Sequence, residues 1–171
     1  MIENKKLCDK LNDVLSKRPE VNPKIDEIIQ HDDKNIKGFF YQYRWMSNFH
    51  LCEIPFIGLN FPSTENAYMA AKSMDMSTQI KFQTLDAKEA KKLGRQIELR
   101  PDWEQIKYDI MYHVNLVKYT KHDDLREKLF ATGDKYLEET NWWGDRIWGV
   151  CQGTGQNHLG RTLMKIREEL R

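Results

Sequence analysis

Cysteine is scarce in this sequence, and long apolar runs are missing from it. The three cysteines, Cys8, Cys52 and Cys151, are an odd number, lie far apart and form no C-x-x-C pair. This argues against a disulfide framework and against a zinc site, and it suits a reducing cytosol. No apolar run approaches the length of a membrane span, and no signal peptide is visible. We therefore expect a cytoplasmic protein that has no membrane contact and needs no metal or other cofactor.

The sequence also lacks an excess of charge of either sign. Its 27 basic and 26 acidic residues leave a formal net charge of +1, so composition gives no general case for attraction to nucleic acid or to membranes. A local basic patch is not visible from composition. With 171 residues, the chain has the size of one domain with a proper core.

Residues 1–35 are predicted to form a helical extension in front of a main domain at residues 36–171. Leucines spaced by four residues give it one apolar stripe, and Pro19 and Pro23 would break that helix. The leucines are Leu7, Leu11 and Leu15, and a second short helix begins with Ile25, Ile28 and Ile29. The extension carries no recognisable chemistry. We expect it to dock on the main domain or on a partner.

The main domain is predicted to combine a few short strands with many helices. Aromatic residues at 38–43 favour a strand, and a hairpin with Gly58 at its turn follows it. Asp86 and Glu89 have the spacing of a capping box at a helix start. Helices are expected from residue 63 or 64 to about 73, then near 86–94, 101–117, 123–133 and 158–171, with a short strand at 136–139.

The central helix carries the first candidate site. Ser63 or Thr64 can cap its start, and Glu65 then lies in the first turn, where the helix dipole favours a carboxylate. Lys72 lies seven residues after Glu65, which returns it to the same face after two turns. Tyr68 lies between them on that side. The helix face therefore offers an acid, an amine and an aromatic hydroxyl, although a solvated helix face has the same pattern.

The second candidate stretch is rich in glycine and tryptophan. Residues 141–160 hold five glycines and three tryptophans in twenty positions and lead into a helix. Glycines let backbone N–H groups approach a ligand closely, and a helix N-terminus favours an anion. The stretch matches neither a P-loop nor a dinucleotide-binding fingerprint. Composition alone leaves a ligand loop and an irregular loop equally open.

Both stretches, taken with three others in the same order, resemble the NADAR family, the YbiA-like N-glycosidases. The resemblance covers residues 37–171. The matching motifs are Ser47–Phe49, Pro62–Lys72, Ala90–Arg95, Trp103, Asp145–Gly149 and Gly155–Gly160. Asn66, Ser73 and Val150–Gln152 depart from the usual family pattern, which leaves the N-glycosidase class intact and the particular substrate open.

The resemblance implies an α+β fold: a mainly helical single domain of the YbiA-like type with a few short strands. It also implies cleavage of an N-glycosidic bond between a ribose and a base. Family members act on two substrate groups. We expect removal of ADP-ribose from ADP-ribosylated guanine in a nucleotide or in DNA; the alternative is a phosphorylated ribosylamino intermediate of riboflavin synthesis.

The reaction needs a proton donor for the base and a group that stabilises or attacks the sugar C1. Lys72 could attack C1 and form a Schiff base with the opened ribose, provided that burial or a cationic neighbour lowers its pKa. We assign acid–base chemistry to Glu65. Asp145 is a second catalytic candidate that could orient ribose hydroxyls, or it is a turn residue.

Other residues are assigned to substrate binding. Arg44, Asn48 and Asn157 could hold hydroxyls or phosphate, and Trp148 could stack on a base or anchor the core. The remaining candidates are Tyr68, Gly149, Gly153, Gly155 and Gly160, the last three as backbone contacts to a diphosphate. Two rival functions stay open: a module that binds ADP-ribose or NAD without cleaving it, and a scaffold whose N-terminal helices dock a partner.

Overall fold

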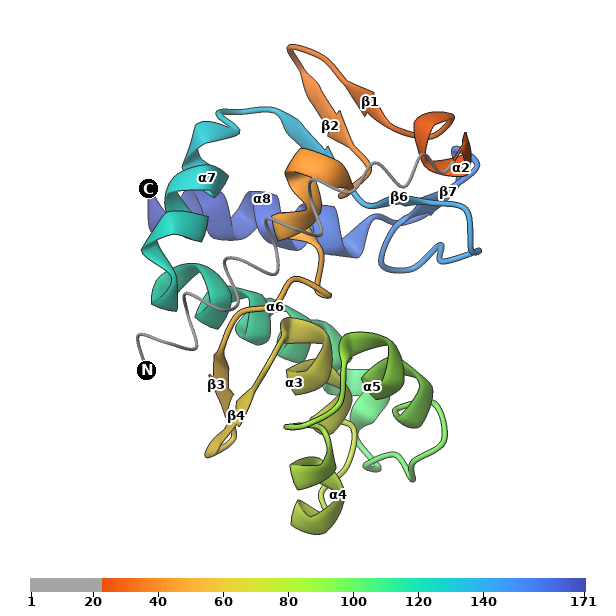
Figure 1. Ribbon diagram of the computed structural model, residues 1–171, viewed down its shortest axis with the longest axis vertical. Helices are drawn as coiled ribbons and strands as arrows, with labels where there is room; N and C mark the ends of the chain where they lie inside the picture. The colour runs from red at the N-terminus through yellow and green to blue at the C-terminus, as the bar shows by residue number, and fades with distance from the viewer. Residues whose placement is uncertain (1–22) are drawn as a thin grey trace. The chain divides into compact units, whose positions relative to one another are not determined.

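The computed structural model describes residues 23–171 (Figure 1). The predicted leucine stripe at 7–15 therefore lies outside the described residues. Helices and short strands alternate along the chain, which confirms the α+β class. The chain divides into a central unit, residues 48–121, and a terminal unit, in which the described residues up to 47 join residues 122–171. Among the described helices, none has the length and apolarity that a membrane span requires.

The central unit is built around one short buried helix. Strands β3 and β4 form the predicted antiparallel hairpin, in which Ile54 pairs with Phe61. Ile57 and Gly58 both have positive φ at its turn, the geometry that suits a two-residue hairpin loop. Helix α3 then packs against α5 and α6. The elements are β3 (Ile54–Phe56), β4 (Leu59–Phe61), α3 (Thr64–Ala70), α4 (Met76–Lys81), α5 (Ala87–Leu93) and α6 (Trp103–Lys121).

Local sequence signals explain where these helices begin. The Ser63 side chain accepts a hydrogen bond from the Asn66 amide at the start of α3, as predicted. Asp86 and Glu89 form the predicted capping box of α5. The buried face of α6 includes the polar residues Asn115 and Lys118 as well as apolar ones. Buried polar side chains of this kind escape a pattern based on hydrophobicity.

The terminal unit holds a small sheet covered by the last helix. Its strand order is β1-β2-β5, with β2 and β5 parallel, and α8 packs against β5. Strands β6 and β7 form a second parallel pair. The elements are α2 (Pro23–Asp26), β1 (Gln30–His31), β2 (Asn35–Lys37), η1 (Tyr41–Met46), α7 (Asp123–Ala131), β5 (Tyr136–Glu138), β6 (Thr140–Asn141), β7 (Val150–Cys151) and α8 (His158–Leu170).

The strand predicted at 38–43 is wrong. The β2 strand ends at Lys37, and Gly38 follows it with a φ of 89°, which turns the chain in a way that other residues resist. Residues 41–46 then form the 3₁₀ helix η1 instead of a strand. Aromatic content favoured a strand here, but the aromatic side chains of this segment pack from a helical turn.

Candidate active site

Glu65 lies in the first turn of the buried helix α3. Its side chain is 5% exposed, and its backbone amide donates to the Asn48 carbonyl at 3.0 Å. The Thr64 hydroxyl donates to the same carbonyl at 3.1 Å. The loop before β3 therefore fixes the N-terminus of α3 and with it the position of the carboxylate.

The Asn48 side chain is buried and hydrogen-bonded inside the central unit. Its side-chain oxygen accepts hydrogen bonds from Thr64 and from Asn115 on α6, each at 3.2 Å. Its amide donates to the Met111 sulfur at 3.2 Å. Through these bonds Asn48 joins α3 to α6 and positions Glu65. Its assignment to substrate binding stays a prediction.

Lys72 lies in the turn after α3, since the helix itself ends at Ala70. Its ammonium group donates to the Gly94 carbonyl at 3.0 Å and lies 5.7 Å from the centre of the Trp103 ring. Burial lowers the pKa of Lys72, and the nearby cations Arg95 and Lys91 lower it further. Glu65 and Glu104 act in the opposite direction and raise this pKa. A lysine with a lowered pKa is a better nucleophile near neutral pH.

Tyr68 packs against Trp103, the ring that lies beside the Lys72 amine. Their ring centres are 5.1 Å apart, and the rings are tilted by 57°. Both side chains are almost fully buried. Trp103 packs in the core, and its contact with Lys72 also makes it part of the amine's environment. The electron-rich ring face stabilises a cation.

Asn66, a departure from the usual family pattern, has a structural role. Its side chain is fully buried. Its amide donates to the carbonyls of Phe82 and Leu85 at 2.9 and 2.8 Å. The residue ties α3 to the segment before α5, so this difference from the family lies beside Glu65 in sequence but serves packing.

Asp145 belongs to the terminal unit and organises a turn. One oxygen of its carboxylate accepts from the Ile147 and Trp148 amides at 3.1 and 2.9 Å. Its own amide and carbonyl bond to the Asn141 side chain. These contacts match the turn interpretation that was left open at the sequence level. A catalytic role for Asp145 remains a prediction.

Three glycines of the glycine-rich stretch are explained by close packing within the terminal unit. A side chain at Gly149 would overlap the Glu139 carboxylate and carbonyl. A side chain at Gly155 would overlap the Gly149 carbonyl, and one at Gly160 would overlap the Leu137 carbonyl. The space beside each of them is thus filled by the protein itself. Gly153 differs, because a Cβ added there would have no neighbour within 4 Å, and its φ is 73°.

The start of α8 is held by protein groups as well. Asn157 precedes it with a left-handed backbone, and its buried side chain bonds to the Leu137 carbonyl, the Tyr136 hydroxyl and the Glu139 amide. The amides of His158 and Leu159 donate to the carbonyls of residues 147 and 148. Two of the first-turn N–H groups that make a helix N-terminus an anion site are therefore already bonded.

Arg44 and Trp148 also belong to the terminal unit. Arg44 lies in η1, and burial lowers the pKa of its guanidinium group. Trp148 is half-buried and meets the His158 ring edge-on, with ring centres 6.1 Å apart. Their proposed contacts with substrate remain predictions.

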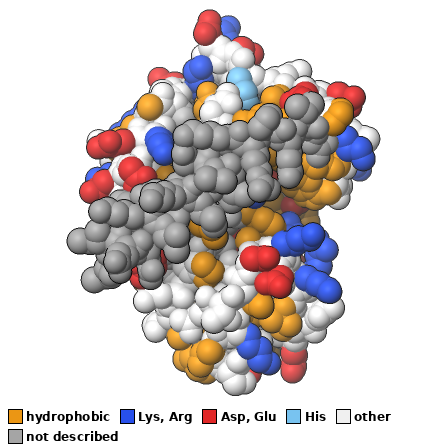
Figure 2. Space-filling view, in the orientation of Figure 1, with side chains coloured by type: hydrophobic (Ala, Val, Ile, Leu, Met, Phe, Trp, Pro, Cys, Tyr) orange, Lys and Arg blue, Asp and Glu red, His pale blue; other side chains and the backbone are white. Residues whose placement is uncertain are grey.

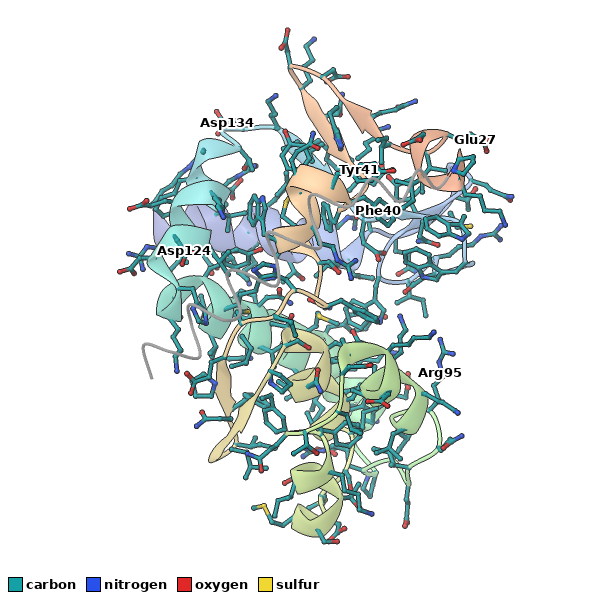
Figure 3. The ribbon with its side chains drawn as sticks, in the orientation of Figure 1. Glu27, Phe40, Tyr41, Arg95, Asp124 and Asp134 are labelled. Atoms are coloured by element: carbon teal, nitrogen blue, oxygen red, sulfur yellow. The ribbon has the colours of Figure 1, made fainter. Side chains whose placement is uncertain are left out.

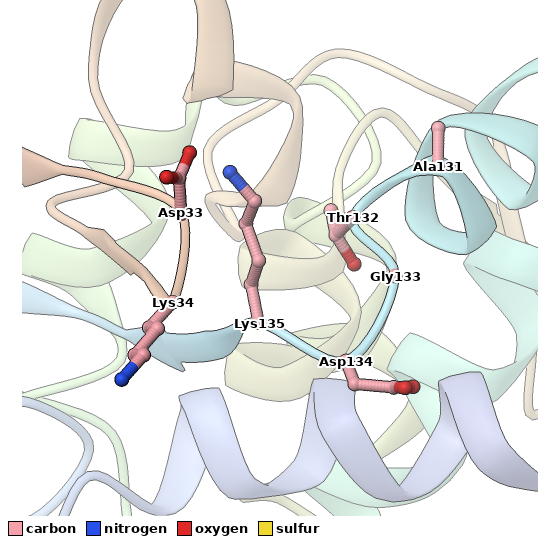
Figure 4. Close-up of a pocket in the computed structure, with 7 residues that line it drawn as sticks. All are labelled: Asp33, Lys34, Ala131, Thr132, Gly133, Asp134 and Lys135. Atoms are coloured by element: carbon pink, nitrogen blue, oxygen red, sulfur yellow. The ribbon is translucent and has the colours of Figure 1, made fainter.

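One described pocket of the terminal unit lies apart from every predicted site residue. It has a volume of about 410 Å³ and is lined by residues 33–34 and 131–135 (Figure 4). Lys135 is already bonded to the Asp32 carbonyl, and Asp134 to Arg171. No group of three or more potential metal-ligating side chains occurs within residues 23–171.

Sequence reasoning missed Gly94, Arg95 and Lys91 as neighbours of Lys72. They come from the Ala90–Arg95 motif, which was recognised as a family resemblance without a chemical role. A Cβ on Gly94 would collide with Met69 of α3, so this glycine lets α5 approach α3 closely. That approach is what brings the Gly94 carbonyl to the Lys72 amine.

Comparisons with known proteins agree with this architecture. The N-glycosidase YbiA of Escherichia coli is 30% identical over 152 residues, covering 86% of this chain and 94% of YbiA. The NMR structure of E. coli YbiA superposes with a TM-score of 0.72 at 29% identity, covering 86% of this chain and 90% of that one.

Two further relatives have different names. An N-glycosidase of Nostoc punctiforme is 36% identical over 144 residues, which cover 78% of this chain and 92% of that protein. A riboflavin biosynthesis protein of Vibrio vulnificus is 36% identical over 140 residues, or 77% of this chain, but the match spans only 38% of that longer protein. The family model of the NADAR domain matches residues 31–171, and the chain therefore belongs to the NADAR domain family.

Proposed function

We propose that this protein is an N-glycosidase that removes ADP-ribose from ADP-ribosylated guanine, through a covalent intermediate on Lys72. The observation that carries the proposal is the environment of Lys72, where burial and two cations lower the pKa of an amine coupled to Glu65. Two relatives named as N-glycosidases, which this chain matches along nearly their whole length, support the reaction class. The covalent step is proposed from the chemistry of the side chains, and the ADP-ribosylated guanine substrate from the family resemblance.

The reaction begins when the bond between ribose C1 and the base nitrogen breaks. Glu65 gives a proton to the departing base, and the lone pair of the neutral Lys72 amine forms a bond to C1. The Lys72 nitrogen then loses a proton. The sugar ring opens as the C1–O4 bond breaks and O4 takes up a proton, which leaves a Schiff base between C1 and Lys72. Water then adds to C1, the C1–nitrogen bond breaks, and free ADP-ribose and neutral Lys72 result.

Glu65→Gln should lower kcat by about 10²- to 10⁴-fold, because the amide keeps the shape of the side chain but cannot transfer a proton. The measurement is steady-state release of base. Glu53→Gln is the matched control, since Glu53 also belongs to the central unit but pairs with Lys121 on its surface. Full turnover by Glu65→Gln with an unchanged circular dichroism spectrum would remove Glu65 from the acid–base role.

The pH dependence of kcat/KM should have an acid limb that lies below the ordinary titration range of lysine. The limb reports loss of the free amine as Lys72 gains a proton, and its pKa is lowered chiefly by burial. Arg95→Gln removes one lowering influence and should move this limb to higher pH. If the acid limb stays at the same pH in both Arg95→Gln and Lys91→Gln, the limb does not report the titration of Lys72.

Cleavage of a phosphorylated ribosylamino intermediate is the second candidate function. Two relatives are named as riboflavin biosynthesis proteins, one from Vibrio vulnificus and one, at 29% identity, from Zea mays. Both are much longer than this chain, which spans 38% and 27% of them. The same amine and carboxylate could serve that reaction, since it breaks the same kind of bond.

Mass spectrometry of the products tests both functions. The protein is incubated with ADP-ribosylated guanosine, with an ADP-ribosylated oligonucleotide and with a ribosylamino-pyrimidine phosphate. Release of free ADP-ribose supports the first function, and release of ribose 5-phosphate alone supports the second. If nothing is cut while ADP-ribose binds in calorimetry, the protein is a binding module and both enzyme proposals are wrong.

A further inference from the structure

Helix α5 and the turn that follows it present cations beside the proposed catalytic amine. Arg95 follows Gly94 directly, and the Gly94 carbonyl accepts the hydrogen bond from Lys72. Lys91 lies four residues before Arg95, so both side chains emerge on the same side of this segment. Figure 3 shows Arg95 at the outside of the central unit, and Figure 2 shows basic side chains gathered on that edge.

Lys91 also approaches the loop before β3. Its ammonium group lies 5.6 Å from the centre of the Phe49 ring. Phe49 follows Asn48, whose carbonyl accepts the Glu65 amide. Both cations act on the Lys72 amine, and Lys91 also lies close to Phe49, in the loop whose Asn48 carbonyl holds the Glu65 amide.

Within residues 23–171, neither Arg95 nor Lys91 forms an ion pair with a carboxylate. Other cations of the central unit do: Arg100 pairs with Asp102, and Lys107 pairs with Glu104. Two like charges placed side by side without a counter-charge repel each other and attract an anion. A bound phosphate would supply the missing negative charge.

We infer that Arg95 and Lys91 form an anion subsite that binds a phosphate group of the substrate beside Lys72. The inference rests on the proposed function, because it assumes that Lys72 attacks a ribose C1. The O5 phosphate lies at the far end of that same sugar, so the group that holds it must lie close to the amine.

The phosphate can come from two sources, namely the diphosphate of ADP-ribose or the backbone of a nucleic acid that carries the modified guanine. A charge-assisted contact to an exposed guanidinium or ammonium group supports about a tenfold effect on binding. We expect Arg95→Gln and Lys91→Gln each to raise KM about tenfold. Lys92→Gln is the matched control, because this exposed lysine of α5 emerges about a quarter-turn away from Lys91.

The kinetics are measured at a pH above the acid limb of each variant, where a changed Lys72 pKa no longer affects the rate. Four charged groups act on that amine: Glu65, Arg95, Lys91 and Glu104. An equal loss with ADP-ribosylated guanosine and with the ADP-ribosylated oligonucleotide identifies the diphosphate as the source. A loss confined to the oligonucleotide, with a steeper salt dependence in the wild type, identifies the nucleic-acid backbone.

Binding of inorganic pyrophosphate, measured by calorimetry, tests the subsite without turnover. We expect the wild type and Lys92→Gln to bind it equally, and Arg95→Gln and Lys91→Gln to bind it about tenfold more weakly. If all four proteins bind alike and have the same KM, the subsite is wrong even when the wild type is an active glycosidase. If the wild type cuts no substrate but pyrophosphate binding still depends on Arg95, the glycosidase proposal alone fails.

Discussion

Lys72→Ala should lower glycosidase activity by about 10³-fold or more, because Lys72 is the proposed covalent nucleophile and its removal eliminates the step that it would perform. Lys72→Arg should be nearly as inactive. An arginine keeps a cation near Trp103 but cannot lose its proton, so it offers no lone pair. The two variants together separate covalent catalysis from simple electrostatic stabilisation of the substrate.

Borohydride reduction gives a direct measurement of the intermediate. When wild-type protein turns over substrate in the presence of borohydride, the peptide that contains Lys72 should gain the mass of the reduced sugar. Lys72→Ala should show no such adduct, and Lys92→Ala should behave like the wild type. Thermal unfolding of each variant checks that the fold survives. Substantial activity in Lys72→Arg would mean that water attacks C1 directly and that the lysine only stabilises charge.

Gly149→Ala should destabilise the terminal unit by about 3 kcal/mol or more. The added methyl group would overlap the carboxylate and the carbonyl of Glu139, and the carbonyl belongs to the backbone, so it cannot move without shifting the chain. The Glu139 carbonyl accepts a hydrogen bond from the Val150 amide at 2.9 Å. A shift of this carbonyl would therefore also strain the pairing of β6 with β7. Denaturant unfolding followed by circular dichroism measures the loss.

Gly144→Ala is the control for Gly149→Ala. Gly144 has a φ of 87° and nothing within 4 Å of an added side chain, so only backbone strain of about 1–2 kcal/mol is expected. The comparison separates crowding from conformational freedom. If Gly149→Ala is as stable as the wild type but fails to bind ADP-ribose, the glycine serves a ligand and the packing explanation is wrong.

Local signals in the sequence were enough to predict much of the fold. Ser63 as a cap, the capping box of Asp86 and Glu89, and the hairpin at Gly58 each depend on residues a few positions apart. The parallel pairing of β2 with β5 joins residues about a hundred positions apart in the chain. Nothing within a two- or three-residue strand specifies such a distant partner, so the sheet could not be predicted.

The candidate site was predictable in its residue types but not in its surroundings. Glu65 and Lys72 were chosen from their spacing on a helix, although the helix ends before Lys72 and the lysine extends from a turn. The cations that lower its pKa come from α5 and the turn after it, and the ring beside it comes from α6. Those neighbours depend on the packing of three helices. The glycine-rich stretch had a composition typical of a ligand loop, but close backbone packing explains most of its glycines.

The hydrogen bond between Lys72 and the Gly94 carbonyl also bears on the stereochemistry of the reaction. A neutral amine that donates one N–H to this carbonyl must direct its lone pair elsewhere, because the lone pair and each N–H are separated by the tetrahedral angle. In the proposed mechanism, the Gly94 carbonyl just after α5 therefore sets the direction of the lone pair of Lys72. Only a sugar whose C1 presents the correct face to that lone pair can react, so the enzyme should discriminate between α- and β-anomers of its substrate.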